Sequence, residues 1–304
     1  MDDGVIEFGS GPPLVLIPGT QGRWEHLRPA IEALARTFRV LTFPLCGERG
    51  AAQPFDPHLG FDNDARQVLS VLDRRALDRA VICGISFGGL PAIRFAATHP
   101  ERVNALVLTS TPAQPWQLRP RHRLYASLPW LFGPLYLVES PFRLWTEIAA
   151  ALPRWSVRQR FVRWQLAALA RAPLSPTRMA ARAALIASTD LRADCADVAA
   201  PTLVVTGERA LDRVVPVDRT LAYVDLIPGA RHATLADTGH LGSITRPDEF
   251  ASLVSGFAMG TTGAERHMRA GAVSEVTANR HLLGACLRNT NTLLVGRLRR
   301  QKPQ

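Results

Sequence analysis

The sequence is almost without lysine. Of its 36 basic residues, only Lys302 is a lysine and the rest are arginines, and the 26 acidic residues leave a net charge of +10. A coding preference for arginine explains this bias. A nucleic-acid-binding protein would gather basic residues with aromatic ones or along a recognition helix, whereas these arginines are spread out, with denser zones at 119–182 and 266–300. We therefore expect no nucleic-acid partner.

Paired cysteines and long apolar runs are missing as well. The cysteines are far apart and show no CxxC or metal-binding spacing: Cys46, Cys83, Cys195 and Cys286. We expect free thiols, as in a reducing compartment. The longest apolar runs fall well short of the ~20 residues that a membrane-spanning helix needs. The start of the chain has no apolar segment typical of a secretion signal. We expect a cytoplasmic protein with no stable membrane insertion.

Apolar runs and helical patterns alternate along two parts of the chain. Runs of strand length lie at 5–8, 14–17, 38–43, 80–83, 103–109 and 203–206. Helical spacing follows them at 24–37, 61–72, 90–98, 216–224 and 248–258, and one more short strand falls at 226–227 or at 233–235. This alternation predicts an α/β fold with a doubly wound, mostly parallel sheet, whose core consists of residues 1–112 and 198–260.

The segment between these two parts has a different texture. Residues 113–197 show no strand-like alternation, hold five of the six tryptophans and carry helix-like stretches interrupted by prolines. We expect a helical cap here. Its apolar patches either pack on the core or form a lid over an acyl pocket.

The last part of the chain, residues 261–304, is polar and basic. It has 8 Arg or Lys residues against 2 Glu residues, and 8 minus 2 gives a charge of +6. The stretches 281–287 and 292–298 would be amphipathic as short helices. We expect a mobile tail, with adhesion to an anionic surface or to a second subunit as the alternative. No pattern in the sequence indicates an oligomeric state.

A serine stands at the apex of a sharp turn, Gly84-Ile85-Ser86-Phe87-Gly88, between an apolar run and a helical pattern. Such a turn strains the serine backbone, and side chains two residues to either side would collide with the adjoining strand and helix. Glycine at 84 and 88 removes those side chains. The serine oxygen then projects at the carboxyl edge of the sheet, where the N–H groups of the next helix also point. The pattern predicts a nucleophile; an incidental serine in a glycine-rich turn is the alternative.

A serine nucleophile needs a base, and the base needs an orienting acid. His240, in Asp237-Thr238-Gly239-His240-Leu241, lies between the last strand and the last helix, and we expect Gly239 to leave room for its imidazole. The rival base His99 ends the helix after Ser86, about 20 Å away. The acid should precede the histidine in the chain.

The expected acid is Asp212, in the loop 207–216 after the strand at 203–206. Glu208, nearer the end of that strand, is its rival, and Asp237 points elsewhere on the loop of His240. An oxyanion hole also needs two N–H donors. The N–H of Phe87 follows the nucleophile, and Thr20 N–H lies in the turn Pro18-Gly19-Thr20 after the first buried strand.

Together these residues resemble the α/β-hydrolase family, in particular serine esterase-like members with a helical cap. The resemblance covers 1–112 and 198–258 and is carried by Pro18-Gly19, the Gly84–Gly88 turn, Asp212 with Pro216, and Gly239-His240 followed by Pro247 and Phe250. It implies a Ser86–His240–Asp212 triad, an acyl-enzyme mechanism on ester substrates and no organic cofactor.

The sequence departs from the family pattern at three places. Pro18 replaces the usual histidine before the oxyanion glycine. The loop after the third strand reads Leu45-Cys46-Gly47-Glu48-Arg49-Gly50 in place of a Gly-His-Gly type. The usual acid position falls on Ala210, so Asp212 implies a loop that is two residues longer.

The leading hypothesis is a serine hydrolase that cleaves small carboxylic esters, with a medium-sized hydrophobic acyl group suggested by the apolar cap. Thioesterases, lactonases, C–C bond hydrolases and cofactor-free haloperoxidases share such a serine. Ser86 excludes an aspartate nucleophile of the kind found in dehalogenases and epoxide hydrolases. The other class is a non-catalytic protein that keeps the pocket for a ligand, and a complete set of triad residues argues against it.

Overall fold

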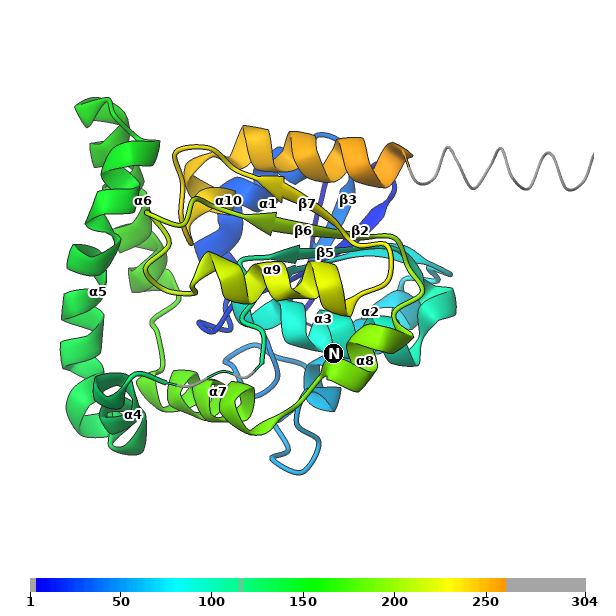
Figure 1. Cartoon of the computed structure of the whole chain (residues 1–304), viewed down its shortest axis with the longest axis horizontal. Coiled ribbons are helices and arrows are strands. Elements are labelled where there is room, and N and C mark those ends of the chain that lie inside the picture. Colours follow the sequence, from blue (N-terminus) through cyan, green and yellow to red (C-terminus); the bar gives the residue numbers. More distant parts are fainter. Residues whose placement is uncertain (1–3, 115, 117, 261–304) are drawn as a thin grey trace, which may run out of the picture. The chain divides into compact units, whose positions relative to one another are not determined.

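The predicted strands lie side by side in one sheet. The computed structural model describes residues 4–260 apart from 115 and 117, and these residues form a sheet of seven strands in the order β1-β3-β2-β4-β5-β6-β7 (Figure 1). β1 is antiparallel to β3, and the other neighbours are parallel. The predictions made for residues 261–304 lie outside the described residues.

The strand bounds agree with the apolar runs to within a few residues: β1 (Ile6–Phe8), β2 (Pro13–Ile17), β3 (Arg39–Thr42), β4 (Ala80–Ile85), β5 (Val103–Thr109), β6 (Thr202–Thr206) and β7 (Arg231–Thr234). β7 decides between the two places considered for the last strand. The α/β fold with a doubly wound, mostly parallel sheet is therefore confirmed.

Both faces of the sheet are covered, which explains why the central strands β2 and β4 carry no polar side chain. Along β2, Val15 and Ile17 face one apolar cluster and Leu14 and Leu16 face the other. The first face packs on α2 (Asp62–Arg74), α3 (Gly89–Thr98) and α9 (Val217–Leu226). The second packs on α1 (Arg28–Leu34), α10 (Gly242–Thr245) and a helix at 247–260 (Figure 1). A short helix, η1 (Trp24–Leu27), precedes α1.

The described residues between β5 and β6 are helical. The helices are α4 (Pro120–Ser127), α5 (Pro129–Ala151), α6 (Trp155–Arg171), α7 (Pro176–Ser188) and α8 (Arg192–Asp197). α8 packs on α3, where Arg94 forms a 2.7 Å ion pair with Asp194. The other four, here called the inserted helices (α4–α7), stand at the end to which the strand arrows point (Figure 1). They therefore lie at the carboxyl edge of the sheet.

None of the helices formed by the described residues is long and apolar enough to span a membrane. The most apolar of the inserted helices, α5, contains Pro134 and Pro141 and exposes Trp130 and Phe142 to solvent.

The turn from β4 to α3 is closed by backbone contact. A Cβ at Gly88 would lie 2.3 Å from the carbonyl oxygen of Ile17, and one at Gly84 would lie 2.4 Å from the Cα of Gly89. No side chain fits at either position, as the Gly84–Gly88 pattern predicts. The turn carries a short helix, η2 (Ser86–Gly88), which brings residue 86 to the carboxyl edge of the sheet.

The substitution Gly88→Ala should destabilise the fold, because the added methyl group meets backbone that cannot move aside. We expect a loss of about 2 kcal/mol in the free energy of unfolding, measured by urea denaturation. Gly256→Ala is the matched control, because nothing lies within 4 Å of a Cβ at that exposed helical position. The control should gain about 0.5 kcal/mol. Equal stability of the two variants would contradict the close contact at Gly88.

Candidate active site

Ser86 occupies the apex of the β4–α3 turn in strained backbone. Its φ is +53°, in the left-handed region that residues other than glycine rarely adopt. Such strain tends to persist at functional sites, where the surrounding structure enforces it. Ser86 is 9% exposed, so its hydroxyl is accessible but shielded from bulk water.

His240 reaches Ser86 from the loop between β7 and α10. Its Nε2 lies 3.1 Å from Ser86 Oγ, within hydrogen-bond distance. On the other side of the ring, Nδ1 lies 3.4 Å from Asp212 Oδ2. This second distance is short enough for an ion pair, but the two groups are not aligned as a hydrogen bond requires. The structure thus brings together Ser86, His240 and Asp212, in the order that the sequence predicts.

Asp212 is held by its own loop. Its Oδ1 accepts hydrogen bonds from the backbone N–H groups of Val214 at 3.0 Å and Val215 at 2.9 Å, which leaves Oδ2 for His240. The N–H groups of Leu211 and Asp212 both donate to the carbonyl oxygen of Glu208 at 3.0 Å. This extra turn takes up the two residues by which the loop is longer than expected.

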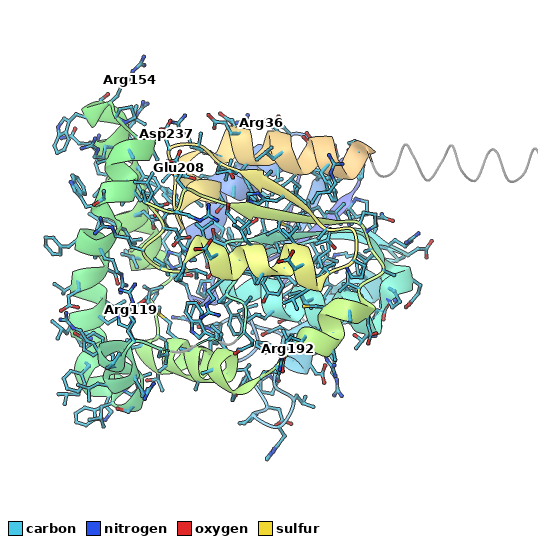
Figure 2. The ribbon with its side chains drawn as sticks, viewed as in Figure 1. Arg36, Arg119, Arg154, Arg192, Glu208 and Asp237 are labelled. Atoms are coloured by element: carbon cyan, nitrogen blue, oxygen red, sulfur yellow. The ribbon has the colours of Figure 1, made fainter. Side chains whose placement is uncertain are left out.

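The rival acid has a different partner. Glu208 Oε1 accepts a hydrogen bond from the backbone N–H of Asp237 at 2.8 Å, and no contact of Glu208 with His240 is found among the described residues. Asp237 itself is exposed and forms an ion pair with Arg246 at 3.3 Å. Figure 2 shows Glu208 and Asp237 close together, on the loops that follow β6 and β7. Glu208 therefore binds the backbone of the loop that carries His240, and it does not contact the imidazole ring in the described structure.

Gly239 lies directly against the acid loop. A Cβ there would lie 2.6 Å from the backbone carbon of Leu211 and 2.7 Å from the backbone nitrogen of Asp212. The missing side chain therefore makes room for the acid loop, and the room expected for the imidazole of His240 stays a prediction. The two loops touch through their backbones, which sets the distance between acid and base.

The surroundings of His240 favour its charged form. Burial opposes the charge, but the Asp212 carboxylate and its contact with the ring outweigh this, with a further contribution from Glu147, so the pKa of His240 is raised above 6.5. The rival His99 lies elsewhere, with its ring stacked on Phe95 and its Nδ1 2.9 Å from Thr98 Oγ1. Nothing in the described part of the chain groups three His, Cys, Asp or Glu side chains so that they could hold a metal ion.

Comparison with known proteins decides the family. The family model of the alpha/beta hydrolase fold matches residues 12–247, which is more than half of the chain. The chain belongs to the α/β-hydrolase family.

Relatives within this family are hydrolases of several kinds. The chain is 33% identical to a pimeloyl-[acyl-carrier protein] methyl ester esterase of Aromatoleum aromaticum, over 80% of this chain and 96% of that protein. It is 27% identical to a 2-hydroxymuconate semialdehyde hydrolase of Pseudomonas sp., over 83% and 88%. An enol-lactonase of Burkholderia xenovorans is similar in structure, with a TM-score of 0.64 and 24% identity over 84% of this chain and 95% of that one, and shares the fold.

One departure from the α/β-hydrolase pattern has a structural role. Glu48, in the unusual 45–50 loop, forms a buried ion pair with Arg182 of α7 at 2.8 Å, and the two side chains are 3% and 5% exposed. Arg182 also donates to the carbonyl oxygen of Thr20 at 3.0 Å and lies over the Phe87 ring. Both expected oxyanion residues, Thr20 and Phe87, are therefore contacted by one arginine of the inserted helices.

A cavity of about 440 Å³ opens onto Ser86 and Thr20. Most of its wall comes from the inserted helices and the segment before them, and is formed by apolar and aromatic side chains, among them Trp116, Tyr125, Tyr136, Met179 and Ile186. The inserted helices thus do more than pack on the core, because they enclose the space beside Ser86.

Sequence reasoning missed one residue at this site. Glu147 of α5 is 1% exposed, and its Oε1 accepts hydrogen bonds from the backbone N–H groups of Gly239, at 2.9 Å, and Leu241. These are the two residues that flank His240. No local pattern marks Glu147, because the contact joins positions more than 90 residues apart. Glu139 and Glu147 both stand inside the largely apolar pattern of 129–151, and nothing in the sequence distinguishes them.

Replacing Asp212 by Asn should lower the pKa of His240, because the carboxylate that stabilises the imidazolium is removed. The wild-type ring should therefore stay charged to higher pH than the variant ring. NMR titration of the ring protons measures this, with the His240 signal assigned by its loss in His240→Gln. Glu208→Gln is the control and should leave the ring titration of His240 as in the wild type. An unchanged pKa in Asp212→Asn would contradict the role of this contact.

Proposed function

We propose that the chain is a serine hydrolase that cleaves carboxylic esters through an acyl-enzyme intermediate. The observation that carries the proposal is the line of contacts from Ser86 Oγ to His240 Nε2, at 3.1 Å, and from His240 Nδ1 to Asp212 Oδ2, at 3.4 Å. A hydroxyl is a weak nucleophile until a base accepts its proton, and this geometry places the base within reach.

In the first half of the reaction, Ser86 Oγ attacks the ester carbonyl carbon while its proton passes to His240 Nε2. The tetrahedral oxyanion accepts hydrogen bonds from the N–H groups of Thr20 and Phe87. The imidazolium, stabilised by Asp212, then gives the proton to the leaving alkoxide, which departs as the alcohol.

In the second half, His240 takes a proton from water, and the resulting hydroxide attacks the acyl-enzyme. The proton returns from His240 to Ser86 Oγ as the acyl–serine bond breaks, and the carboxylic acid leaves. His240 is neutral before each attack, so its raised pKa shifts the acidic limb of the activity profile to higher pH than an ordinary histidine would give.

The cavity suggests the acyl group. A largely apolar space of about 440 Å³ suits a medium-sized hydrophobic chain and encloses it away from water. In this proposal the inserted helices act as the cap that forms the acyl pocket. The substrate is a small molecule, and we propose a cytoplasmic enzyme, as expected from the sequence.

The same cavity also favours a negative charge on the substrate. Four arginines line it, Arg119, Arg143, Arg213 and Arg219, and no carboxylate does so among the described residues. Arg143 is half-buried and its Nε has no hydrogen-bond partner in the described structure, while its Nη1 lies 2.9 Å from His122 Nε2. Burial and the neighbouring arginines lower the pKa of His122, which favours its neutral ring, and a neutral ring does not balance the charge of Arg143. We propose that the acyl chain carries a carboxylate that pairs with Arg143.

Other target bonds are the alternative to an ester. The names of the relatives include a methyl ester esterase of a pimeloyl group and a hydrolase of a muconate derivative, so a C–C bond, a lactone or a thioester is the alternative target. A non-catalytic ligand-binding protein is the remaining alternative, and the contact of His240 with Ser86 argues against it.

Ser86→Ala should abolish cleavage of p-nitrophenyl butyrate, with kcat falling by about 10⁴-fold or more, because no other group can form the acyl-enzyme. The wild type should also react covalently with a fluorophosphonate probe, and the variant should not. Ser252→Ala, at an exposed position of the last helix, is the control for the substitution itself. Undiminished turnover by the folded Ser86→Ala variant would contradict the proposal. A folded wild type that neither cleaves esters nor reacts with the probe would favour a ligand-binding protein.

The anionic preference is tested with matched esters. The mono-p-nitrophenyl ester of glutaric acid should be cleaved with a kcat/KM about tenfold above that of p-nitrophenyl butyrate, since one charge-assisted contact is worth about 1.5 kcal/mol. Arg143→Met should reduce this ratio to about one. Arg163→Met, at an exposed position of α6 that does not line the cavity, should keep it. A wild-type preference for the neutral ester would overturn this part of the proposal while leaving the esterase reaction intact.

A further inference from the structure

Glu147 is a buried acid that contacts the backbone on both sides of His240. It lies on α5, among the inserted helices, and is almost completely buried at 1% exposure. Its Oε1 binds both backbone N–H groups that flank His240, those of Gly239 and Leu241. One oxygen atom from the inserted helices therefore holds the main chain on both sides of the ring that contacts Ser86.

The second oxygen of the carboxylate indicates that Glu147 does more than accept hydrogen bonds. Glu147 Oε2 is buried and has no hydrogen-bond partner in the described structure. A neutral acceptor would satisfy the two N–H groups without the cost of burying a charge. Burial, with a smaller contribution from Asp212, raises the pKa of Glu147 to about 7, against the opposing effects of the His240 charge and the two backbone bonds. A positively charged His240 therefore draws Glu147 towards its ionised form.

The surroundings make this coupling strong. Ile148 and Ala151 of α5 form an apolar cluster with Leu152, which follows the helix, and Leu241 packs against it. Glu147 is buried at 1% exposure, so the interaction between its carboxylate and the imidazolium is screened less than at a surface. Asp212, across the ring, acts on both Glu147 and His240, and Arg143, one turn before Glu147 on α5, opposes the charge of His240.

We propose that Glu147 is a positioning residue, through which helix α5 holds His240 in line with Ser86 and stabilises its charged form. The proposal rests on the proposed function, because it assigns a part of that reaction to Glu147. Asp212 orients the ring through Nδ1, whereas Glu147 fixes the backbone that carries the ring. The triad is then assembled only when α5 is seated against the histidine loop.

Two substitutions separate the hydrogen bonds from the charge. Glu147→Gln keeps a carbonyl oxygen for Gly239 and Leu241 but removes the negative charge, and Glu147→Ala removes both. Glu139→Gln is the matched control, because Glu139 lies on the same helix and pairs with Arg121 at the surface. Each variant is compared with the wild type in kcat and KM for p-nitrophenyl butyrate across pH, in the NMR titration of the His240 ring, and in urea denaturation.

We expect Glu147→Gln to lower the pKa of His240, seen both in the NMR titration and as a shift of the acidic limb of kcat/KM to lower pH. Glu147→Ala should lower kcat by about a hundredfold with a smaller change in KM, because a base displaced by a fraction of an ångström loses its alignment. Glu139→Gln should match the wild type in all three measurements. If Glu147→Ala does not fold, Glu147→Gln still decides the question.

A purely structural Glu147 would give a different result. Both variants would then unfold at lower urea, while the ring titration, the pH profile and kcat of the folded protein stayed as in the wild type, and the proposal would be wrong. Failure of the esterase reaction is distinguishable from this outcome. A wild type without turnover removes the proposed function, whereas the NMR titration still reports whether Glu147 acts on His240.

Discussion

The site depends on one largely buried imidazole that has to gain and lose a charge. An isolated imidazolium in an apolar interior is costly, so its neighbours must stabilise the charge without fixing it permanently. Asp212 stabilises the charge next to the ring nitrogen Nδ1, and Glu147, bound to the backbone on both sides of His240, adds a further contribution. The backbone contact at Gly239 makes this possible, because it sets the acid loop directly against the histidine loop.

The inserted helices are attached to this centre at two opposite places. Arg182 of α7 binds the Thr20 carbonyl and Glu48, next to the expected oxyanion donors, while Glu147 of α5 binds the loop of His240. Each attachment uses a charged side chain that is 5% exposed or less. Buried charges of this kind are poor choices for stability alone, since apolar residues would serve as well. In the proposed reaction, their value lies in fixing the relative position of the oxyanion donors and the histidine base.

The sequence was sufficient for the sheet, the serine turn and the three residues that meet there, because each has a local pattern: strand-length apolar runs, paired glycines, and loops that follow strands. Choosing Asp212 over Glu208 was harder. It depended on the turn that closes at the Glu208 carbonyl, which a count of loop residues does not reveal. Glu147 could not be found at all, since its partners are two backbone N–H groups that only the packing of α5 brings near. Gly239 was singled out for its place before His240, whereas its backbone contact with the acid loop has no local signal, because Leu211 and Asp212 lie far from it in the sequence.

The near absence of lysine bears on how the cavity responds to pH. Guanidinium groups keep their charge well beyond pH 12, whereas an amine in an apolar pocket loses its proton far more readily. The four arginines of its wall therefore stay charged across the range in which proteins work, and His122 is the side chain of the described lining whose ordinary pKa lies near neutrality. In the proposed reaction, binding of an anionic substrate by the arginines therefore depends less on pH than proton transfer by His240 does.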